Sequence, residues 1–348
     1  MAAFLPPPQC NNISITHNEQ KYSNLIEKTS ERYKETLPKL TKAKGWMTEH
    51  LVHYQGVWLT PKAALKGLMW IQDHFKPRPT DILLATFPKT GTTWLKALIF
   101  ATVNRTHYGF SDHPLLTTGP HDCFPFLDAY VYENDRSFHD LEKFPSPRLL
   151  STHIPFTLLQ TSMTDDQSCR FVYICRDPKD VLVSKWLFMN KLRPKRLPPI
   201  SLEEAFELFC QGISHYGPYW DHVLGYWKAS LENPEKILFL KYEDLKKEPF
   251  AVVKRLGEFT GHPFSPEEES RGVVQEIVKL CSFENLSNLE VNKTSVQKFS
   301  RDIVVDNRHF FRKGKVGDGK NYLTAEMIER LNAITSEKLH DSGLVFGN

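Results

Sequence analysis

The segment DILLATFPKTGTTWLKALIFATV, residues 81–103, divides into three consecutive elements. Its first part, 81–87, is a short apolar run that predicts a buried β-strand. A turn containing Gly91 follows at 88–93, and residues 94–103 predict a helix. A strand, a glycine-containing turn and a helix form the opening unit of α/β folds that bind nucleotides.

Three further segments predict buried strands of the same kind. They are 149–152, 170–175 and 236–240, and the last two are each followed by a predicted helix. Another helix is predicted from Thr60 and Pro61 to His74, because Thr60 is a suitable N-cap and proline favours the first helical position. Alternating strands and helices predict a central, mainly parallel sheet flanked by helices. Ligands bind at the carboxyl ends of such strands, where the sequence places Lys89, His153, Arg176 and Tyr242.

The predicted domain organisation is simple. Residues 1–44 form an N-terminal segment that we expect to be partly disordered, over the Pro- and Asn-rich positions 1–18, and partly helical, over 22–33. Residues 45–348 form a single α/β domain.

Composition argues against several classes of protein. The net charge is +3, and the densest basic stretch, 191–196, is more typical of a solvated loop than of a nucleic-acid surface. The six cysteines form no CxxC pair and no zinc-type spacing, which predicts free thiols. No apolar run approaches the roughly 20 residues that cross a bilayer, and the first residues lack the features of a signal peptide. We therefore expect a cytoplasmic protein with no nucleic-acid or membrane partner.

The turn after the first strand has the chemistry of an anion site. Gly91 allows the backbone to approach a ligand closely, and the free N–H groups of the helix start favour negative charge. Thr90, Thr92 and Thr93 add hydroxyl donors, and Lys89 adds a full charge. The order differs from a Walker A motif, where lysine follows the second glycine, so magnesium-nucleotide chemistry is not indicated. The alternative is a plain capped helix after a strand.

Five ordered motifs together resemble the cytosolic sulfotransferases, most closely those of plants. The resemblance extends over about residues 45–345. The motifs are FPKTGTTWLKAL at 87–98, STHIPF at 151–156, YICRDPKDVLVS at 173–184, FLKYEDL at 239–245 and FFRKGKVGD at 310–318. The resemblance implies a P-loop-like sulfotransferase fold. It also implies transfer of a sulfuryl group from 3'-phosphoadenosine 5'-phosphosulfate (PAPS) to a hydroxyl of a small organic acceptor. Plant relatives act on flavonols, brassinosteroids, hydroxyjasmonates and desulfoglucosinolates, and the sequence does not choose among these acceptors.

The same resemblance implies a role for each donor-site residue. Lys89 would stabilise charge on the bridging oxygen as the sulfuryl group leaves. Because a sulfuryl group carries less charge than a phosphoryl group, and no metal-ligand set is visible, we expect no metal. The implied donor-binding residues are Lys89, Thr90, Gly91, Thr92, Thr93 and Trp94 around the 5'-end and adenine, Arg176, Ser184, Arg312, Lys313 and Gly314 at the 3'-phosphate, and Tyr242, Ser282 and Phe283 near the adenine. The alternatives are core packing for the aromatic residues and an ion pair of Arg176 with Asp177 or Asp180.

His153 is the candidate general base. An alcohol or phenol must lose its proton as it attacks sulfur, and an imidazole with a pKa near neutrality suits that task. A structural histidine at a strand end is the alternative. Many animal members carry lysine two positions before this histidine, whereas this chain has Ser151, so Lys89 is the expected main cation of the site.

Two segments leave questions open. The family usually has Gly-Asp-Trp after the C-terminal motif, but this chain has Gly317-Asp318-Gly319, which predicts a looser segment with weaker PAPS binding or dimer contacts. Residues 320–329 only partly resemble the dimer motif of animal members, so a homodimer is left open.

The acceptor pocket is expected from Phe124 to Tyr132, from Trp186 to Pro198 and near Phe156, with an aromatic lining for an apolar ligand. Ordinary core packing is the alternative for these residues. Two other functions compete with the transferase: a nucleotide kinase, which would need the Walker A order, and a nucleotide-binding protein of the same fold with lost or reduced transferase activity.

Overall fold

The structure is a computed structural model that describes residues 17–128, 141–159, 161–164, 169–300 and 303–346. The chain divides into two units, 1–39 and 40–348. The first unit contains helix α1 (His17–Thr36) and the 3-10 turn η1 (Leu37–Lys39), and the helical periodicity predicted at 22–33 falls within α1. The predicted disorder of the first residues lies mostly outside the described residues. The domain boundary predicted at 44 and 45 stays a prediction.

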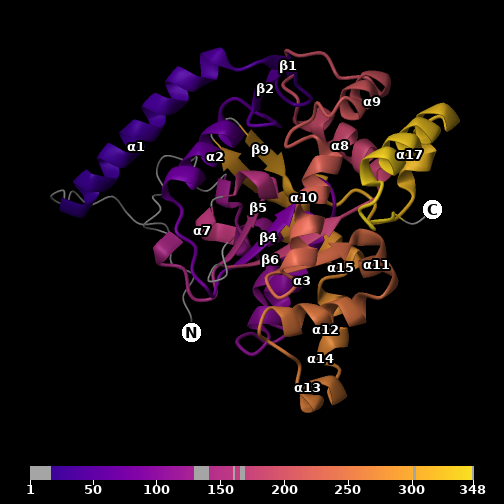
Figure 1. The fold of residues 1–348 in the computed structure, drawn as a ribbon. Helices are drawn as coiled ribbons and strands as arrows, with labels where there is room; N and C mark the ends of the chain where they lie inside the picture. The colour runs from indigo at the N-terminus through magenta and orange to yellow at the C-terminus, as the bar shows by residue number, and fades with distance from the viewer. Residues whose placement is uncertain (1–16, 129–140, 160, 165–168, 301–302, 347–348) are drawn as a thin grey trace. The chain divides into compact units, whose positions relative to one another are not determined.

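A parallel four-stranded sheet forms the centre of the second unit (Figure 1). Its order is β5-β4-β6-β7, from β4 (Ile82–Thr86), β5 (Leu149–Thr152), β6 (Arg170–Cys175) and β7 (Ile237–Lys241). All four strands were predicted, and β4 and β5 are buried at every position. The register pairs Ala85 with Thr152 and Thr86 with Ile174, so three neighbouring strands end at one level.

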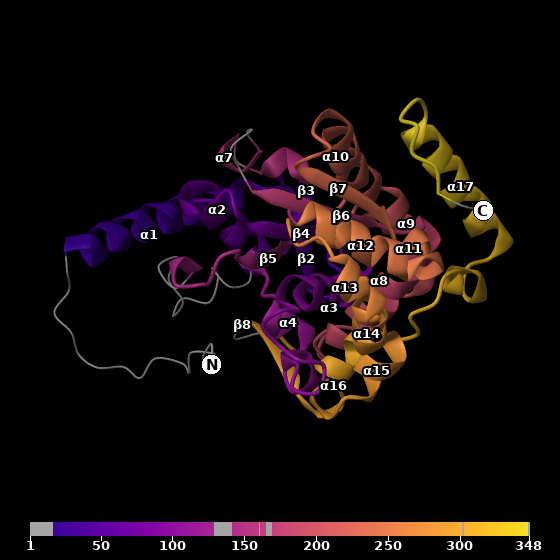
Figure 2. The same cartoon turned by 90° about the horizontal axis from the view of Figure 1, so that it is seen from below.

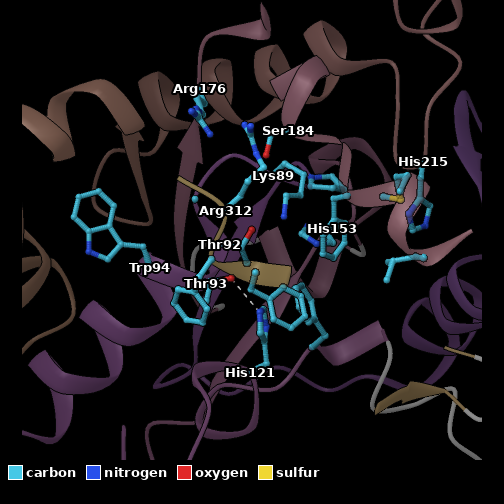
Figure 3. A pocket seen from close by; sticks show the side chains of 18 of the residues that line it. Lys89, Thr92, Thr93, Trp94, His121, His153, Arg176, Ser184, His215 and Arg312 are labelled. Carbon is cyan, nitrogen blue, oxygen red and sulfur yellow. Dashed lines mark hydrogen bonds between the residues drawn. The ribbon is translucent and has the colours of Figure 1, made fainter. Parts of the chain in front are cut away.

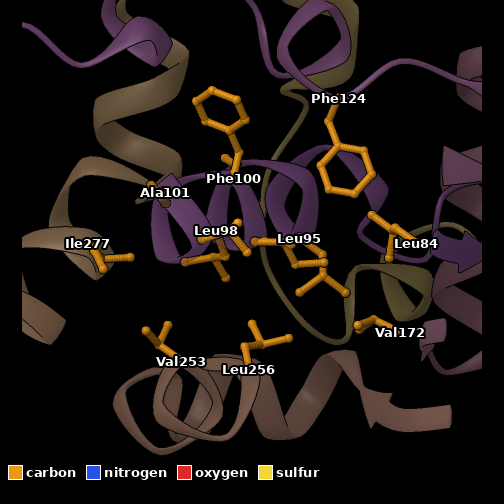
Figure 4. Packing of buried hydrophobic residues seen from close by; sticks show 14 of the residues in the cluster. Leu84, Leu95, Leu98, Phe100, Ala101, Phe124, Val172, Val253, Leu256 and Ile277 are labelled. Atoms are coloured by element: carbon orange, nitrogen blue, oxygen red, sulfur yellow. The ribbon is translucent and has the colours of Figure 1, made fainter. Parts of the chain in front are cut away.

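Alternate residues of the strands face two separate helical layers. Leu84 and Val172 face α3 (Thr92–Asn104), α12 (Pro249–Phe259) and α14 (Val273–Leu280), in a cluster that includes Leu98 and Leu256 (Figure 4). On the other face, the ring of Tyr173 stacks on Tyr226 of α10 (Tyr219–Glu232) with centroids 4.3 Å apart. The prediction that helices flank the sheet is therefore confirmed.

The helices that begin at strand ends have identifiable starts. Helix α8 (Pro178–Leu192) follows β6 and begins with proline after Asp177, whose carboxylate accepts the N–H of Lys179 at 2.8 Å. Helix α2 (Ala63–His74) begins two residues after the predicted Pro61, although the Thr60 hydroxyl still accepts the N–H of Ala64 at 3.2 Å. Helix α11 (Tyr242–Lys247) follows β7 directly.

Smaller elements complete the second unit (Figure 2). An antiparallel sheet of β1 (Lys42–Lys44), β2 (His50–Tyr54) and β3 (Val57–Leu59) and a hairpin of β8 (Val296–Ser300) and β9 (Ile303–Asp306) were not predicted. The remaining helices are α4 (Pro120–Cys123), α7 (Thr161–Thr164), α9 (Leu202–Cys210), α13 (Pro266–Ser270), α15 (Phe283–Asn288), α16 (Glu290–Thr294) and α17 (Ala325–Leu339). In the part of the chain that the structure describes, every helix is too short or too polar to span a membrane.

Candidate active site

A cavity of about 240 Å³ opens where the central strands end. Lys89, His153, Arg176 and Tyr242, which follow the four strands, all line it. Figure 3 shows the first three of these side chains. The sequence-predicted residues that also line the cavity are Gly91, Thr92, Thr93, Trp94, Ser184, Phe283, Arg312, Lys313 and Gly314. The structure therefore brings together segments that lie more than 200 residues apart in the chain.

Thr90 and Ser282 are placed differently from the other predicted site residues. The Thr90 hydroxyl is buried and donates to the carbonyl of Phe87 at 2.9 Å, within the turn itself. Ser282 caps α15 by accepting the N–H of Asn285 at 3.1 Å. Neither side chain lines the cavity, so both hydroxyls stabilise the local backbone.

The turn after β4 has a backbone that suits an anion. Lys89 has a φ of 77° and Gly91 a φ of 119°. A Cβ on Gly91 would come within 2.8 Å of the Tyr242 ring, so only glycine fits this position. Among the described residues, no side chain caps the start of α3. Its first N–H groups and the helix dipole therefore remain available to a negatively charged ligand.

Several basic side chains line the cavity, among them Lys89, Arg176, Arg312 and Lys313. Burial, followed by the charges of Arg312 and Arg176, lowers the pKa of Lys89 to about 7. The Nε atoms of Arg176 and Arg312 are buried and have no hydrogen-bond partner among the described residues. Buried guanidinium donors without partners are costly unless an acceptor binds them, so the cluster fits an anionic ligand.

Asp180 joins the strand-end arginine to the C-terminal segment. Its carboxylate accepts Arg176 Nη2 at 2.9 Å, Gly317 N at 2.8 Å and Gly319 N at 2.7 Å. Arg176 also donates to the carbonyl of Lys315 at 2.7 Å. The ion pair considered from sequence therefore exists, with Asp180 and not Asp177, and it orients an arginine that still lines the cavity.

The expectation that Gly319 loosens the C-terminal segment is wrong. Gly319 is buried, and a Cβ there would lie 2.9 Å from the backbone of Lys179. The neighbouring Asp318 forms ion pairs with Arg312 and Lys313. Close backbone packing and these pairs hold the segment without a large ring.

His153 is held in place by hydrogen bonds to residues of two other elements, Thr86 of β4 and His222 of α10. Its Nδ1 lies 2.6 Å from the carbonyl oxygen of Thr86, which can only accept, so Nδ1 carries the proton. Burial lowers the pKa of His153 well below its usual value, and nearby His215 lowers it further. The ring is thus neutral near pH 7, with the lone pair on Nε2. His222 Nε2 donates to the His153 carbonyl at 3.0 Å and fixes the backbone.

A buried polar chain that the sequence did not indicate adjoins the site. His121 Nε2 lies 3.0 Å from Thr93 Oγ1, and His121 Nδ1 lies 3.1 Å from Lys96 Nζ. Lys96 is fully buried. One signal was visible in the sequence: Lys96 is the single charge in the run 94–103, and a buried lysine requires a partner.

The other end of the cavity is largely apolar. It is lined by residues that include Met47, Ala63, Ala64, Phe126, Phe188, Met189, Leu192, Phe299 and Phe310. Of the segments predicted for the acceptor, the residues that line the cavity are Phe126, Asp128, Phe188, Met189 and Leu192. Phe124 belongs to the core, and Phe156 packs on Tyr226 with centroids 5.4 Å apart. Tyr130 and Tyr132 lie outside the described residues. Within the described ranges, no three His, Cys, Asp or Glu side chains gather as a metal site would require.

Comparison with known proteins gives consistent similarities. A family model described as "Sulfotransferase domain" matches residues 79–343. Cytosolic sulfotransferase 16 of Arabidopsis thaliana is 47% identical over 324 residues, which cover 92% of this chain and 94% of that protein. The crystal structure of a putative steroid sulphotransferase from Arabidopsis thaliana is 39% identical, with a TM-score of 0.69 over 90% of this chain and 94% of the other. A mouse sulfotransferase complexed with 3'-phosphoadenosine 5'-phosphate (PAP) is 25% identical, with a TM-score of 0.64 over 84% and 96% of the two chains.

Proposed function

Because this chain belongs to the plant-type cytosolic sulfotransferase family, we propose that it takes its sulfuryl group from PAPS and passes it to a hydroxyl of a small plant metabolite. Sulfuryl transfer itself follows from membership of the family. The donor, the acceptor class and the residue roles are the proposal. The observation that carries it is the convergence of a neutral His153 with Lys89, Arg176 and Arg312 in one cavity.

The basic end of the cavity supports PAPS as the donor. Partnerless Nε atoms on Arg176 and Arg312 suit the 3'-phosphate, and Ser184 on α8 adds a hydroxyl donor to the same wall. Gly314 has a φ of 63°, and a Cβ there would meet the Phe283 ring at 2.6 Å, so this loop packs closely on an aromatic surface. Trp94, Tyr242 and Phe283 supply faces for an adenine. The mouse relative that was solved with PAP supports the same choice.

The catalytic roles follow from position and protonation. His153 Nε2 has the lone pair that accepts the proton of the acceptor hydroxyl. The acceptor oxygen then forms its bond to sulfur as the bond between sulfur and the bridging phosphate oxygen breaks, leaving PAP. Lys89, positioned by the turn after β4, stabilises the negative charge on that oxygen. An anionic ligand raises the pKa of Lys89 from about 7, so that the cation forms when it is needed.

The apolar end of the cavity supports a hydroxylated acceptor with a large apolar body. Phe126 contributes aromatic surface beside His153, with ring centroids 4.7 Å apart, and Phe188 and Phe310 line the same cavity. Flavonoids, brassinosteroids and hydroxyjasmonates share that chemistry and form the first panel to test. The alternative, a nucleotide-binding protein of the same fold with lost or reduced transferase activity, would bind PAP without transferring the sulfuryl group.

The location and the assembly of the protein are each open to a direct test. We place the protein in the cytosol, since the Arabidopsis relative is named a cytosolic sulfotransferase. Cell fractionation tests this location. Sedimentation of the purified chain tests the homodimer that the sequence left open.

Calorimetric titration with PAP, in the absence of metal and with ADP as the control, tests the donor site. We expect tight binding of PAP and weak binding of ADP, which lacks the 3'-phosphate. Transfer of labelled sulfate from PAPS to the acceptor panel then tests turnover. Equal affinity for the two nucleotides, or binding that requires magnesium, would contradict PAPS as the donor.

A further inference from the structure

Three side chains form a hydrogen-bonded chain from the cavity wall into the core. Thr93 lines the cavity, and its Oγ1 lies 3.0 Å from Nε2 of the buried His121 (Figure 3). On the far side of the imidazole, Nδ1 lies 3.1 Å from Nζ of Lys96, which is fully buried in the third position after Thr93 on α3. His121 also lines the cavity, whereas Lys96 does not. Lys96 can therefore act through its hydrogen bond to His121, and its charge also lowers the pKa of His153.

Stability alone does not explain a lysine at this place. Helix α3 is otherwise buried along its length by apolar packing, and an apolar side chain of similar volume would avoid the desolvation of an ammonium. Burial lowers the pKa of Lys96 well below its usual value, and the charges of Asp128 and Asp122 offset only part of that effect. The Phe126 ring, with its centroid 3.5 Å from Nζ, also favours the charged form.

When Lys96 is an ammonium, which is the form that the proposal below requires, it determines the direction of the whole chain. An ammonium has donors but no acceptor, so His121 Nδ1 must accept from Lys96. The single proton of the neutral imidazole then lies on Nε2 and is donated to Thr93 Oγ1. The hydrogen of the Thr93 hydroxyl is therefore not used by His121 and is free to be donated into the cavity. In the opposite tautomer, Nε2 would accept that hydrogen and remove the donor.

We propose that Lys96 and His121 are positioning residues that fix the Thr93 hydroxyl as a hydrogen-bond donor to the sulfuryl group during transfer. The proposal rests on the function proposed above and adds a source of charge stabilisation besides Lys89. The contact is made to the sulfuryl group, so it acts on turnover more than on nucleotide affinity.

Two substitutions of His121 separate the role of its two nitrogens. His121→Gln keeps an N–H group near the position of Nε2, whereas His121→Asn is too short to reach Thr93. We expect His121→Asn to lower kcat about 10- to 100-fold, the scale of one hydrogen bond to a charged group. His121→Gln should recover most of that loss. The Kd of PAP, which lacks the sulfuryl group, should change by less than about threefold in both variants.

A double-mutant cycle tests whether His121 acts through Thr93. Thr93→Val removes the hydroxyl and should lower kcat by a similar factor. In the Thr93→Val background, His121→Asn should have no further effect, because the donor it directs is gone. Independent, multiplicative losses would overturn the proposal.

Nitrogen-15 NMR of labelled histidine gives a readout that packing alone would not change. The wild type should show His121 as the Nε2–H tautomer, identified by the signal that His121→Asn removes. Lys96→Met keeps the volume but removes the donor, and it should shift His121 toward the Nδ1–H tautomer. An unchanged tautomer in Lys96→Met, or Nδ1–H in the wild type, would overturn the proposal.

His113→Asn is the matched control. His113 is also buried, its Nδ1 accepts the N–H of Leu115 at 3.2 Å, and it does not line the cavity. Asparagine can keep that acceptor, so kcat should stay unchanged; a loss equal to that of His121→Asn would show a general packing effect and refute the positioning role. Absence of transfer by the wild type would refute the proposed function instead, and wild-type turnover with a multiplicative cycle would refute the positioning role alone.

Discussion

Replacing His153 by asparagine removes a base while keeping the hydrogen bond that orients it. The His153 ring donates from Nδ1 to the carbonyl of Thr86 at 2.6 Å, and the amide of asparagine can place an N–H near the same point. Asparagine has no lone pair at the position of Nε2 that could take a proton near pH 7. His153→Asn therefore changes the chemistry of the site more than its architecture.

The expected size of the effect can be worked from these contacts. Loss of a general base lowers kcat by roughly 10²- to 10⁴-fold, or about 2.7–5.4 kcal/mol in activation free energy at 1.36 kcal/mol per tenfold step. The lost ring contacts with Phe126 and Tyr216, at centroid distances of 4.7 and 5.4 Å, cost only about 1 kcal/mol each in folding free energy. Catalysis should thus fall far more than stability.

The assay is single-turnover transfer of labelled sulfate from PAPS, with PAP titration and thermal melting of the same preparation. His153→Asn should bind PAP as the wild type does and melt cooperatively. Transfer within about tenfold of the wild type would refute the assignment of His153 as general base. Loss of PAP binding together with transfer would show instead that the substitution disturbs the nucleotide site.

The remaining predictions concern the nucleotide end of the cavity. Gly91→Ala should lower the unfolding free energy by about 1–3 kcal/mol, because it adds a Cβ 2.8 Å from the Tyr242 ring at a φ of 119°; a melting temperature equal to the wild type would contradict this. Lys89 has a pKa of about 7 in the free protein, so it is mostly neutral at pH 8 and should take up close to one proton as the anion raises that pKa. Calorimetry in buffers of different ionisation enthalpy measures this proton uptake. If Lys89→Met takes up as many protons as the wild type, a group other than Lys89 is responsible. Arg312→Met should weaken PAP about 10- to 100-fold and leave ADP almost unchanged, whereas an equal loss for both nucleotides would argue against a 3'-phosphate contact.

The sheet was predictable because its strands carry their signal locally. The runs around Leu84, Val172 and Leu238 are short, apolar and followed by turn residues, and each became a buried strand. Strands β1 to β3 escaped prediction because they are short and polar at several positions, as in Lys42–Lys44. Each of these strands is stabilised by pairing with another strand, and the sequence of one segment does not show which strand that is.

The site was predictable where chemistry follows a strand and unpredictable where it depends on tertiary contact. Lys89, His153 and Arg176 stand directly after strands, so the topology alone gathers them. The partnership of Lys96 with His121 requires α4 to fold against α3, 25 residues away in sequence. Such a contact leaves no periodic pattern for sequence reasoning to detect.

The Gly319 prediction failed for a related reason. Loss of a large ring was expected to leave a gap, but the backbone itself closes it by approaching Lys179 and Asp180. Whether a missing side chain leaves a gap depends on how closely the main chain packs against its neighbours. That distance cannot be predicted from the identity of a single residue.

The shared register of the strands has a consequence for how acceptors can diversify. Thr152 and Ile174 pair with Ala85 and Thr86 on opposite sides of β4, so His153 and Arg176 emerge two inter-strand spacings apart, roughly 10 Å. That span is set by peptide geometry, which no substitution in the acceptor wall alters. Under the proposed function, wall residues such as Leu192 can therefore change to suit other substrates while the spacing of His153 and Arg176 stays the same.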